Sequence, residues 1–255
     1  MLGAMIGDIV GSVYEWDNIQ TSDFEFFKPS CFFTDDTVLT AATAQALLTD
    51  GDYARAYQDF ARRYPGRGYG SRFAQWVLQD NPQPYNSWGN GSAMRVSPVG
   101  FALDTIEDVL AEAERSARVT HNHPEGVKGA QATALAILLA RQGADKTEIR
   151  TEISGRFAYD LTRTLDEIRP NYAFHVSCQR SVPEAILAFL ESTSFENAIR
   201  LAISLGGDSD TLANIAGGIA EAYYGIPIKI STAGSKYLSK EFNILKKEFY
   251  QNFPI

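Results

Sequence analysis

Cysteine is scarce in this chain of 255 residues, which contains only Cys31 and Cys178. Two cysteines exclude a disulfide framework, and because they lack metal-site spacing we interpret them as small buried hydrophobes of a reducing compartment. Long apolar runs are also missing: no window approaches about 18 uncharged residues, so no membrane-spanning helix is predicted. The N-terminal stretch contains Asp8 and no basic segment, so we expect no signal peptide. These absences predict a cytoplasmic protein.

Positive charge is scarce as well, because 23 Lys and Arg stand against 31 Asp and Glu and give a net charge of −8. A nucleic-acid backbone is therefore not expected as a partner. The apolar fraction of 45% and the charged fraction of 21% are ordinary for a globular protein and exclude disorder. No long linker or internal repeat interrupts the chain, so we expect residues 1–255 to form a single domain, and we expect a monomer.

Strand signals are weak, because no run of alternating β-branched and aromatic residues is flanked by hairpin turns. Helical periodicity instead covers most of the chain, and the sequence predicts an all-α fold. Near the N-terminus Gly3, Gly7 and Gly11 form a stripe, which predicts a close helix crossing, since a helical glycine otherwise costs about 1 kcal/mol relative to alanine. Further helices are predicted at 38–48, 53–64, 104–117 (with Asp104 and Glu107 as a capping box), 125–141, 147–168, 183–192, 195–205, 211–224 and 239–251.

Two acidic clusters precede predicted helices. The first is Thr34-Asp35-Asp36-Thr37, and the second is Gly206-Gly207-Asp208-Ser209-Asp210-Thr211. Helix capping explains one Asp or Thr in each cluster, and for either cluster alone it is as good an explanation as a metal site. Paired acids exceed what a cap requires, however, and the pattern occurs twice. Carboxylate and hydroxyl oxygens are hard ligands, so both clusters are candidate sites for Mg²⁺, Mn²⁺ or Ca²⁺.

Glu15 is a third candidate donor. We expect it at the end of the first predicted helix, near one face with Asp8 and Ser12. If Glu15 and the two clusters converged, five carboxylates would repel one another strongly and would require about two divalent cations. That convergence is a hypothesis at this point.

Five motifs in fixed order carry a resemblance to a known family. They are Gly7-Asp8…Gly11…Tyr14-Glu15, Thr34-Asp35-Asp36-Thr37, Gly89-Asn90-Gly91-Ser92-Ala93-Met94-Arg95, Thr120-His121 and Gly206-Gly207-Asp208-Ser209-Asp210-Thr211. Together they resemble the ADP-ribosylglycohydrolase family from about residue 2 to Gly225. The resemblance implies an orthogonal helical bundle with a binuclear Mg²⁺ or Mn²⁺ centre. It also implies hydrolysis at C1 of the distal ribose, which releases ADP-ribose from a modified acceptor such as arginine or serine.

The resemblance also implies the roles of individual residues. It assigns the metal ligands Thr34, Asp35, Asp36, Asp208, Asp210 and Thr211, with Asp210 as the bridge and Glu15 as a mobile carboxylate that reaches metals and ribose. Glu15 or Asp36 would serve as the general base. It assigns substrate contacts to Gly68, Gly70, Ser87, Trp88, Gly89, Asn90, Gly91, Ser92 and His121. Taken alone, the 87–92 segment is an ordinary turn and His121 is as readily structural. Arg95 is expected to offset the acidic centre or to orient this loop.

Two other functions stay open. A metal-dependent phosphoesterase could use the same hard-ligand centre on a pyrophosphate. A catalytically inactive ADP-ribose-binding relative is the second alternative, but it should lack a ligand carboxylate, and none is missing. The G-x-S-x-G and H-E-x-x-H motifs are absent from the sequence. The sequence leaves the acceptor open among arginine, serine, poly(ADP-ribose), nucleic-acid ends and free metabolites, so the expected substrate is an ADP-ribosylated protein or small molecule.

Overall fold

The computed structural model describes residues 1–254, and in this range the chain is α-helical, with one isolated β-bridge between Gly89 and Ser177. The helices are α1 (Leu2–Gly11), α2 (Asp35–Leu48), α3 (Tyr53–Arg63), α4 (Ser71–Val77), α5 (Gly91–Met94), α6 (Ser97–Ala102), α7 (Ile106–Arg118), α8 (Pro124–Arg141), α9 (Lys146–Phe157), α10 (Leu165–Ile168), α11 (Cys178–Glu191), α12 (Phe195–Ile203), α13 (Ser209–Tyr224), α14 (Ile228–Gly234) and α15 (Lys240–Asn252), with a 3-10 turn η1 (Arg169–Asn171). The all-α prediction is confirmed.

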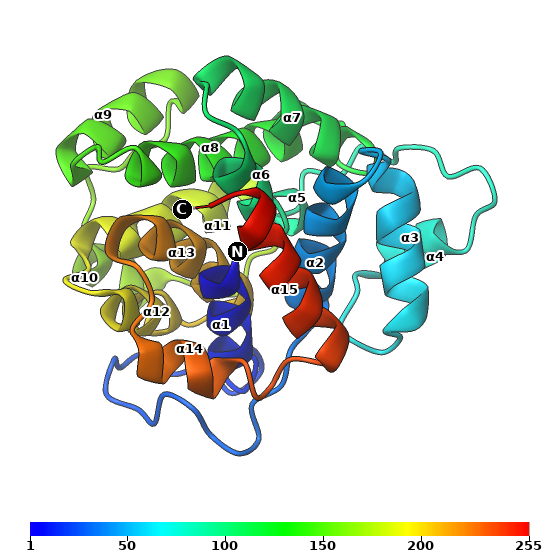
Figure 1. Cartoon of the computed structure of the whole chain (residues 1–255). Coiled ribbons are helices and arrows are strands. Elements are labelled where there is room, and N and C mark those ends of the chain that lie inside the picture. Colours follow the sequence, from blue (N-terminus) through cyan, green and yellow to red (C-terminus); the bar gives the residue numbers. More distant parts are fainter. Residues whose placement is uncertain (255) are drawn as a thin grey trace.

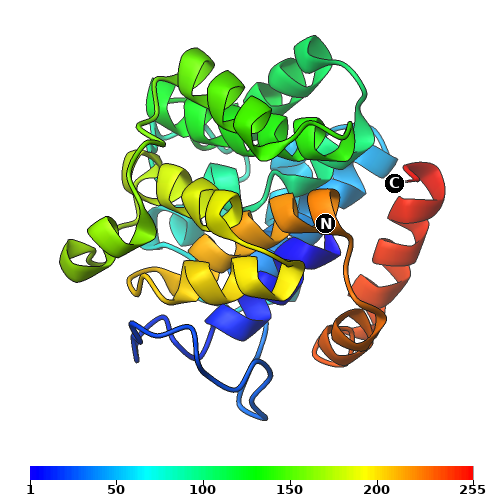
Figure 2. The same cartoon turned by 90° about the vertical axis from the view of Figure 1, so that its left-hand side faces the viewer.

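Helices α1 and α13 cross inside the bundle, and α8, α11 and α12 pack around α13 (Figure 1). Helix α2 packs against α1 and α3, and α15 lies along α2. Helices α7, α8 and α9 form a layer at the top of both views, whereas the blue segment between α1 and α2 projects at the bottom (Figure 2). The buried apolar side chains form one connected core. The single-domain organisation stays a prediction.

The glycine stripe of α1 makes the crossing with α13. A Cβ atom on Gly7 would lie 2.0 Å from the carbonyl oxygen of Ala213, and one on Gly11 would lie 2.5 Å from the Cα of Asp210. A Cβ on Gly3 would likewise lie 2.4 Å from a backbone oxygen of α13. Backbone atoms cannot move aside as a side chain can, so only glycine permits this approach. The predicted close crossing is confirmed, and it brings Asp210 against the end of α1.

A buried ion pair joins the other ends of the same helices. The Met1 ammonium group donates to Glu221 Oε2 at 2.7 Å, and the backbone N–H of Gly3 donates to the same oxygen. The hydroxyl of Tyr250 in α15 donates to the other carboxylate oxygen of Glu221. Burial lowers the pKa of the Met1 ammonium group to about 6, and Glu221 opposes this effect. Helices α1, α13 and α15 therefore share one buried polar network.

Several predicted boundaries are wrong. Helix α1 ends at Gly11, so Glu15 lies in the turn that follows and not on the helix. Helix α7 is capped by Thr105, whose side chain accepts from the N–H of Asp108, and not by Asp104. The predicted helix 147–168 is broken after α9, where Ala158 adopts a left-handed conformation with φ of 54°. The short helices α4, α5, α6 and α14 carry too few residues to show periodicity.

Within residues 1–254, none of the helices combines the length and apolar character needed to cross a bilayer.

The crossing predicts opposite effects for two glycine substitutions. Gly7→Ala should lower the free energy of unfolding by about 3 kcal/mol or more, because its Cβ meets backbone. Gly155→Ala in α9 is the matched control, since nothing lies within 4 Å of the added Cβ; it should be neutral or stabilise by up to about 1 kcal/mol. Urea denaturation measures both, and a Gly7→Ala variant with wild-type stability would contradict the crossing.

Candidate metal and substrate site

A cavity of about 440 Å³ lies where the turn after α1, the start of α2, the start of α13 and four loops meet. Its lining combines carboxylates, glycines, basic side chains and aromatic rings. The acidic groups are Glu15, Asp35, Asp36, Asp208 and Asp210, and the hydroxyl of Thr211 lies among them. The two acidic clusters and Glu15, which are far apart in the sequence, therefore share one cavity.

Three of the carboxylates meet closely. Glu15, Asp208 and Asp210 each place one oxygen within 4.8 Å of the others. The hydroxyl of Thr211 lies 3.4 Å from Asp36 Oδ2, which brings the α2 cluster next to the α13 cluster. The structure thus brings together the carboxylates whose convergence the sequence left as a hypothesis.

The electrostatics of this cluster favour a cation. Burial, and then the charges of Asp8 and Asp35, raise the pKa of Asp36 well above its ordinary value. Burial and neighbouring carboxylates also raise the pKa of Asp210. The pKa of Glu15 rises to about 7, first because of burial and then because of the Asp208 charge. Asp36 Oδ1 is buried and has no hydrogen-bond partner among the described residues. Hard oxygen donors with uncompensated charge fit divalent cations.

Asp8 holds the start of α2 in place. Its fully buried carboxylate accepts hydrogen bonds from the N–H of Thr34 at 3.0 Å, the hydroxyl of Thr34 at 2.7 Å and the N–H of Thr37 at 3.0 Å. Burial raises the pKa of Asp8 to about 6, although these hydrogen bonds oppose the shift. The hydroxyl proton of Thr34 is therefore already donated to Asp8. The sequence placed Asp8 near one face with Glu15 but did not predict this role; its signal is an acid inside an apolar, glycine-striped helix.

Two asparagines fix the turn that carries Asp208. The side-chain amide of Asn90 donates to Asp208 Oδ2 at 2.7 Å. Asn18 accepts from the N–H of Gly207 at 2.8 Å and donates to its carbonyl at 3.0 Å and to the carbonyl of Glu15 at 2.9 Å. Asn18 thus joins the backbone of Glu15 to the residue before Asp208. The sequence analysis missed Asn18, because its partners lie in a turn that is distant in the chain.

Most of the predicted substrate-binding residues line the cavity: Gly68, Gly70, Ser87, Gly89, Asn90, Gly91 and His121. Two lie elsewhere. Trp88 is half-exposed and its ring packs against His123, with ring centroids 5.6 Å apart. Ser92 is fully buried and donates to the carbonyl of Gly126 at 2.6 Å. The geometry therefore ties Ser92 to packing behind the loop, and its substrate contact stays a prediction.

An aromatic pair at the mouth of the cavity was not predicted. Trp16 is 82% exposed and stacks on Phe174, with ring centroids 5.3 Å apart and an interplanar angle of 22°. Both rings line the cavity together with Val176. An exposed stacked pair beside Glu15 offers a flat apolar surface to a ligand. The sequence carried no signal for it, because Phe174 lies in an irregular segment.

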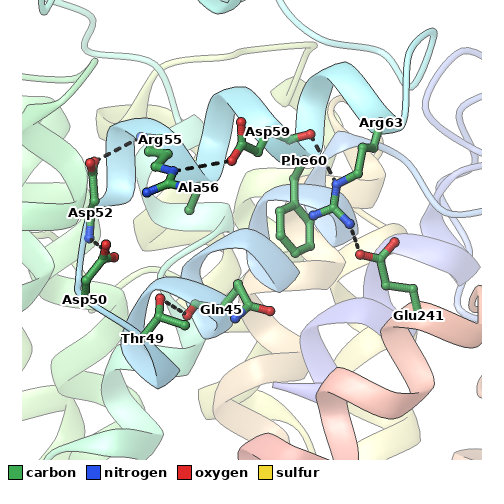
Figure 3. Close-up of a pocket in the computed structure, with 10 residues that line it drawn as sticks. All are labelled: Gln45, Thr49, Asp50, Asp52, Arg55, Ala56, Asp59, Phe60, Arg63 and Glu241. Atoms are coloured by element: carbon green, nitrogen blue, oxygen red, sulfur yellow. Dashed lines mark hydrogen bonds and ion pairs between the residues drawn. The ribbon is translucent and has the colours of Figure 1, made fainter.

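A second cavity, of about 350 Å³, lies among α2, α3 and α15 (Figure 3). Two of its four carboxylates are paired with its two arginines: Arg55 pairs with Asp59 at 3.8 Å, and Arg63 pairs with Glu241. The side chain of Asp52 caps α3 by accepting from the N–H of Arg55. We therefore assign the functional site to the first cavity, where carboxylates of like charge lie together.

Comparisons with known proteins identify similar chains. A family model described as ADP-ribosylglycohydrolase matches residues 1–233. ADP-ribosylhydrolase ARH3 of Mus musculus is 28% identical over 306 aligned residues, which cover 89% of this chain and 83% of that protein. ADP-ribosylarginine hydrolase Tri1 of Pseudomonas putida (strain GB-1) is 30% identical and is covered over 70% of its length. A solved structure titled ADP-ribosylglycohydrolase-related protein complex superimposes with a TM-score of 0.71 at 26% identity, over 98% of this chain and 96% of that chain.

The clustered carboxylates predict stabilisation by divalent cations. Mg²⁺ or Mn²⁺ should raise the melting temperature, because a cation selective for the folded state adds about 2.7 kcal/mol at a hundredfold excess over its Kd. Asp36→Asn should weaken this metal-dependent shift and should stabilise the metal-free protein, since it removes a repelling charge. Asp23→Asn, on an exposed loop, is the matched control and should behave as wild type. A metal-dependent shift that is equal in all three proteins would contradict the assignment.

Proposed function

The chain belongs to the ADP-ribosylglycohydrolase family, and we propose that it hydrolyses the glycosidic bond at C1 of the distal ribose in an ADP-ribosylated arginine or serine side chain. Family membership and the similarity to ADP-ribosylhydrolases support the hydrolytic removal of ADP-ribose. The observation that carries the finer proposal is one cavity lined by the carboxylates of both acidic clusters, by Glu15 and by glycine-rich loops.

Divalent cations fit this donor set. Two Mg²⁺ or Mn²⁺ ions would be held by Asp35, Asp36, Asp208, Asp210 and Thr211, with Thr34 and Glu15 as further ligands. When bound, such ions supply Lewis-acid polarisation of the ribose hydroxyls and the attacking water. The close approach of Glu15, Asp208 and Asp210 supports this assignment. The roles of Asp8, Asn18 and Asn90 are then to hold these ligands in place through hydrogen bonds.

Glu15 is the residue that we assign as general base. It is partly buried and lines the cavity with one carboxylate oxygen close to those of Asp208 and Asp210, so it can accept a proton from a water held there. It also lies in a turn, where its side chain can follow the substrate, whereas Asp36 is fixed at the start of α2. The bond that breaks leaves positive charge on the ribose, and the surrounding carboxylates stabilise this oxocarbenium-like transition state.

The glycine loops are assigned to the ADP-ribose phosphates. Gly68 has a φ of 100°, and a Cβ atom added to it would lie 3.1 Å from Asp35 Oδ1. This loop therefore passes directly beside the acidic cluster. Cβ atoms added to Gly91 and Gly89 would likewise lie 3.2 Å and 3.5 Å from His121 Nε2. Because glycine has no side chain, a phosphate group can approach the backbone of these loops closely; the N–H of Gly89 already donates to Ser87 Oγ at 3.1 Å. Ser87 and the exposed Trp16 and Phe174 rings complete the contact surface that we propose for the ligand.

We propose a cytoplasmic setting for the reaction. Cys31 and Cys178 are free and buried, which supports a reducing compartment such as the cytoplasm. Partners are ADP-ribosylated proteins or small molecules, with ADP-ribose as the product, and the protein acts as a monomer.

Turnover of defined substrates tests the reaction. Peptides carrying ADP-ribosyl-arginine or ADP-ribosyl-serine should release intact ADP-ribose with Mg²⁺ or Mn²⁺, and mass spectrometry identifies the product. The Asp210→Ala variant, which removes a central carboxylate, should lose this activity. Release of AMP and ribose-5-phosphate would instead indicate a phosphoesterase, and binding of ADP-ribose without turnover would indicate an inactive relative.

Glu15→Gln separates chemistry from binding. Loss of a positioned base should lower kcat by about 10²–10⁴-fold, whereas the affinity for ADP-ribose should change little, because the glycine loops are untouched. Glu25→Gln makes the same chemical change on an exposed loop residue and should leave both quantities unaltered. Calorimetry with ADP-ribose and steady-state kinetics measure the two effects. Equal losses of affinity and rate in Glu15→Gln would show that Glu15 only contributes to binding.

A further inference from the structure

His121 presents one ring nitrogen to the protein interior and the other to the cavity. Its Nδ1 lies 2.7 Å from the hydroxyl oxygen of Thr120. An added Cβ on Gly91 would lie 3.2 Å from His121 Nε2, and one on Gly89 would lie 3.5 Å from it. Nε2 therefore faces the cavity wall formed by these two glycines, and its protonation decides what His121 offers to a ligand.

The hydroxyl of Thr120 has a second neighbour, Arg95. The guanidinium Nη2 of Arg95 lies 2.8 Å from Thr120 Oγ1 and 3.1 Å from the carbonyl oxygen of Ser116. Arg95 is fully buried, and its guanidinium carbon lies 4.0 Å from the ring centroid of Tyr57. A guanidinium group only donates hydrogen bonds, so Thr120 Oγ1 is an acceptor from Arg95.

The direction of the hydrogen bond between Thr120 and His121 follows from the number of protons available. Thr120 is fully buried, and its hydroxyl makes no hydrogen bond other than those with Arg95 and His121 in the part of the chain that the structure describes. If His121 Nδ1 carried a proton, the Thr120 oxygen would accept twice and its own proton would be buried without an acceptor, which is unfavourable. The satisfied arrangement has Thr120 donating to Nδ1, so the ring proton is on Nε2.

We propose that Thr120, oriented by Arg95, is a positioning residue that holds His121 as a neutral imidazole whose Nε2–H donates to a ligand oxygen in the cavity. The assignment of that oxygen to ADP-ribose rests on the proposed function, whereas the assignment of the tautomer does not. Burial, and then the positive charges of Arg95 and Arg72, hold the pKa of His121 well below its usual range, which agrees with a neutral ring. His121 then has no free lone pair toward the cavity and is a hydrogen-bond donor, not a general base.

Nitrogen-15 NMR of the histidine rings tests the tautomer directly in the ligand-free protein. The chain contains three histidines, so His123→Gln and His175→Gln assign the His121 signals. At neutral pH, His121 should show a protonated Nε2 and an unprotonated Nδ1. A protonated Nδ1, or protons on both nitrogens, overturns the proposal. This result does not depend on whether the protein hydrolyses or binds ADP-ribose.

Substitutions at Thr120 test its role as the positioning residue. Thr120→Val keeps the shape of the side chain and removes the hydroxyl; the single tautomer should be lost, and the affinity for ADP-ribose should fall up to about tenfold, as expected for one neutral hydrogen bond. Thr120→Ser restores the hydroxyl and should keep the wild-type spectrum and affinity. The Mg²⁺- or Mn²⁺-dependent melting shift should be unchanged in both. A changed His121 tautomer in Thr120→Ser, or an unchanged tautomer and affinity in a folded Thr120→Val, overturns the proposal.

Discussion

The contact on which the site depends is the backbone-to-backbone approach of α1 and α13. Because Gly7 and Gly11 have no side chains, the two helices meet at a distance that a single Cβ would prevent. Asp8 sits on one helix of this crossing and Asp210 on the other, so the distance between the helices sets the distance between the acidic groups. Larger residues in the stripe would push the helices apart and separate the carboxylates, which makes the stripe part of the site although it touches no ligand.

The close approach of the helices brings carboxylates of like charge together, and hydrogen-bond donors compensate only part of that charge. Asp8 is satisfied by Thr34 and Thr37, and Asp208 is satisfied in part by Asn90, so their negative charge is shared with hydrogen-bond donors. Asp36 and Asp210 have less compensation, and burial together with neighbouring carboxylates raises their pKa values, like that of Asp35, well above the ordinary range. Folding therefore leaves a concentration of uncompensated negative charge at one place, and the remaining balance must come from bound cations or protons.

Local patterns in the sequence predicted much of this arrangement. Helical periodicity gave the all-α fold, and the glycine spacing gave the α1–α13 crossing, because both depend on neighbouring positions along one helix. Two of the failures were local, and the others were long-range. Thr and Asp are both favoured N-cap residues, so the sequence does not choose between Asp104 and Thr105. No proline or glycine follows Gly11 before Glu15, so nothing in the sequence marks the end of α1 there. Asn18, by contrast, acts on Gly207, and Arg95 acts on His121 through Thr120; such pairs exist only once the chain has folded.

The way in which Asn18 holds Glu15 has a consequence for how the site opens. The aspartates of α2 and α13 are fixed by helix backbones, and moving them would require unwinding a helical turn. The segment of Glu15 is held to the Gly207 turn by one exposed side-chain amide and its few hydrogen bonds. Opening this segment breaks those bonds, each of about 1 kcal/mol, and the Trp16–Phe174 stack, but it leaves the global fold intact. The aspartates therefore stay at rigid helix ends, whereas the Glu15 segment can move without disturbing α2 or α13.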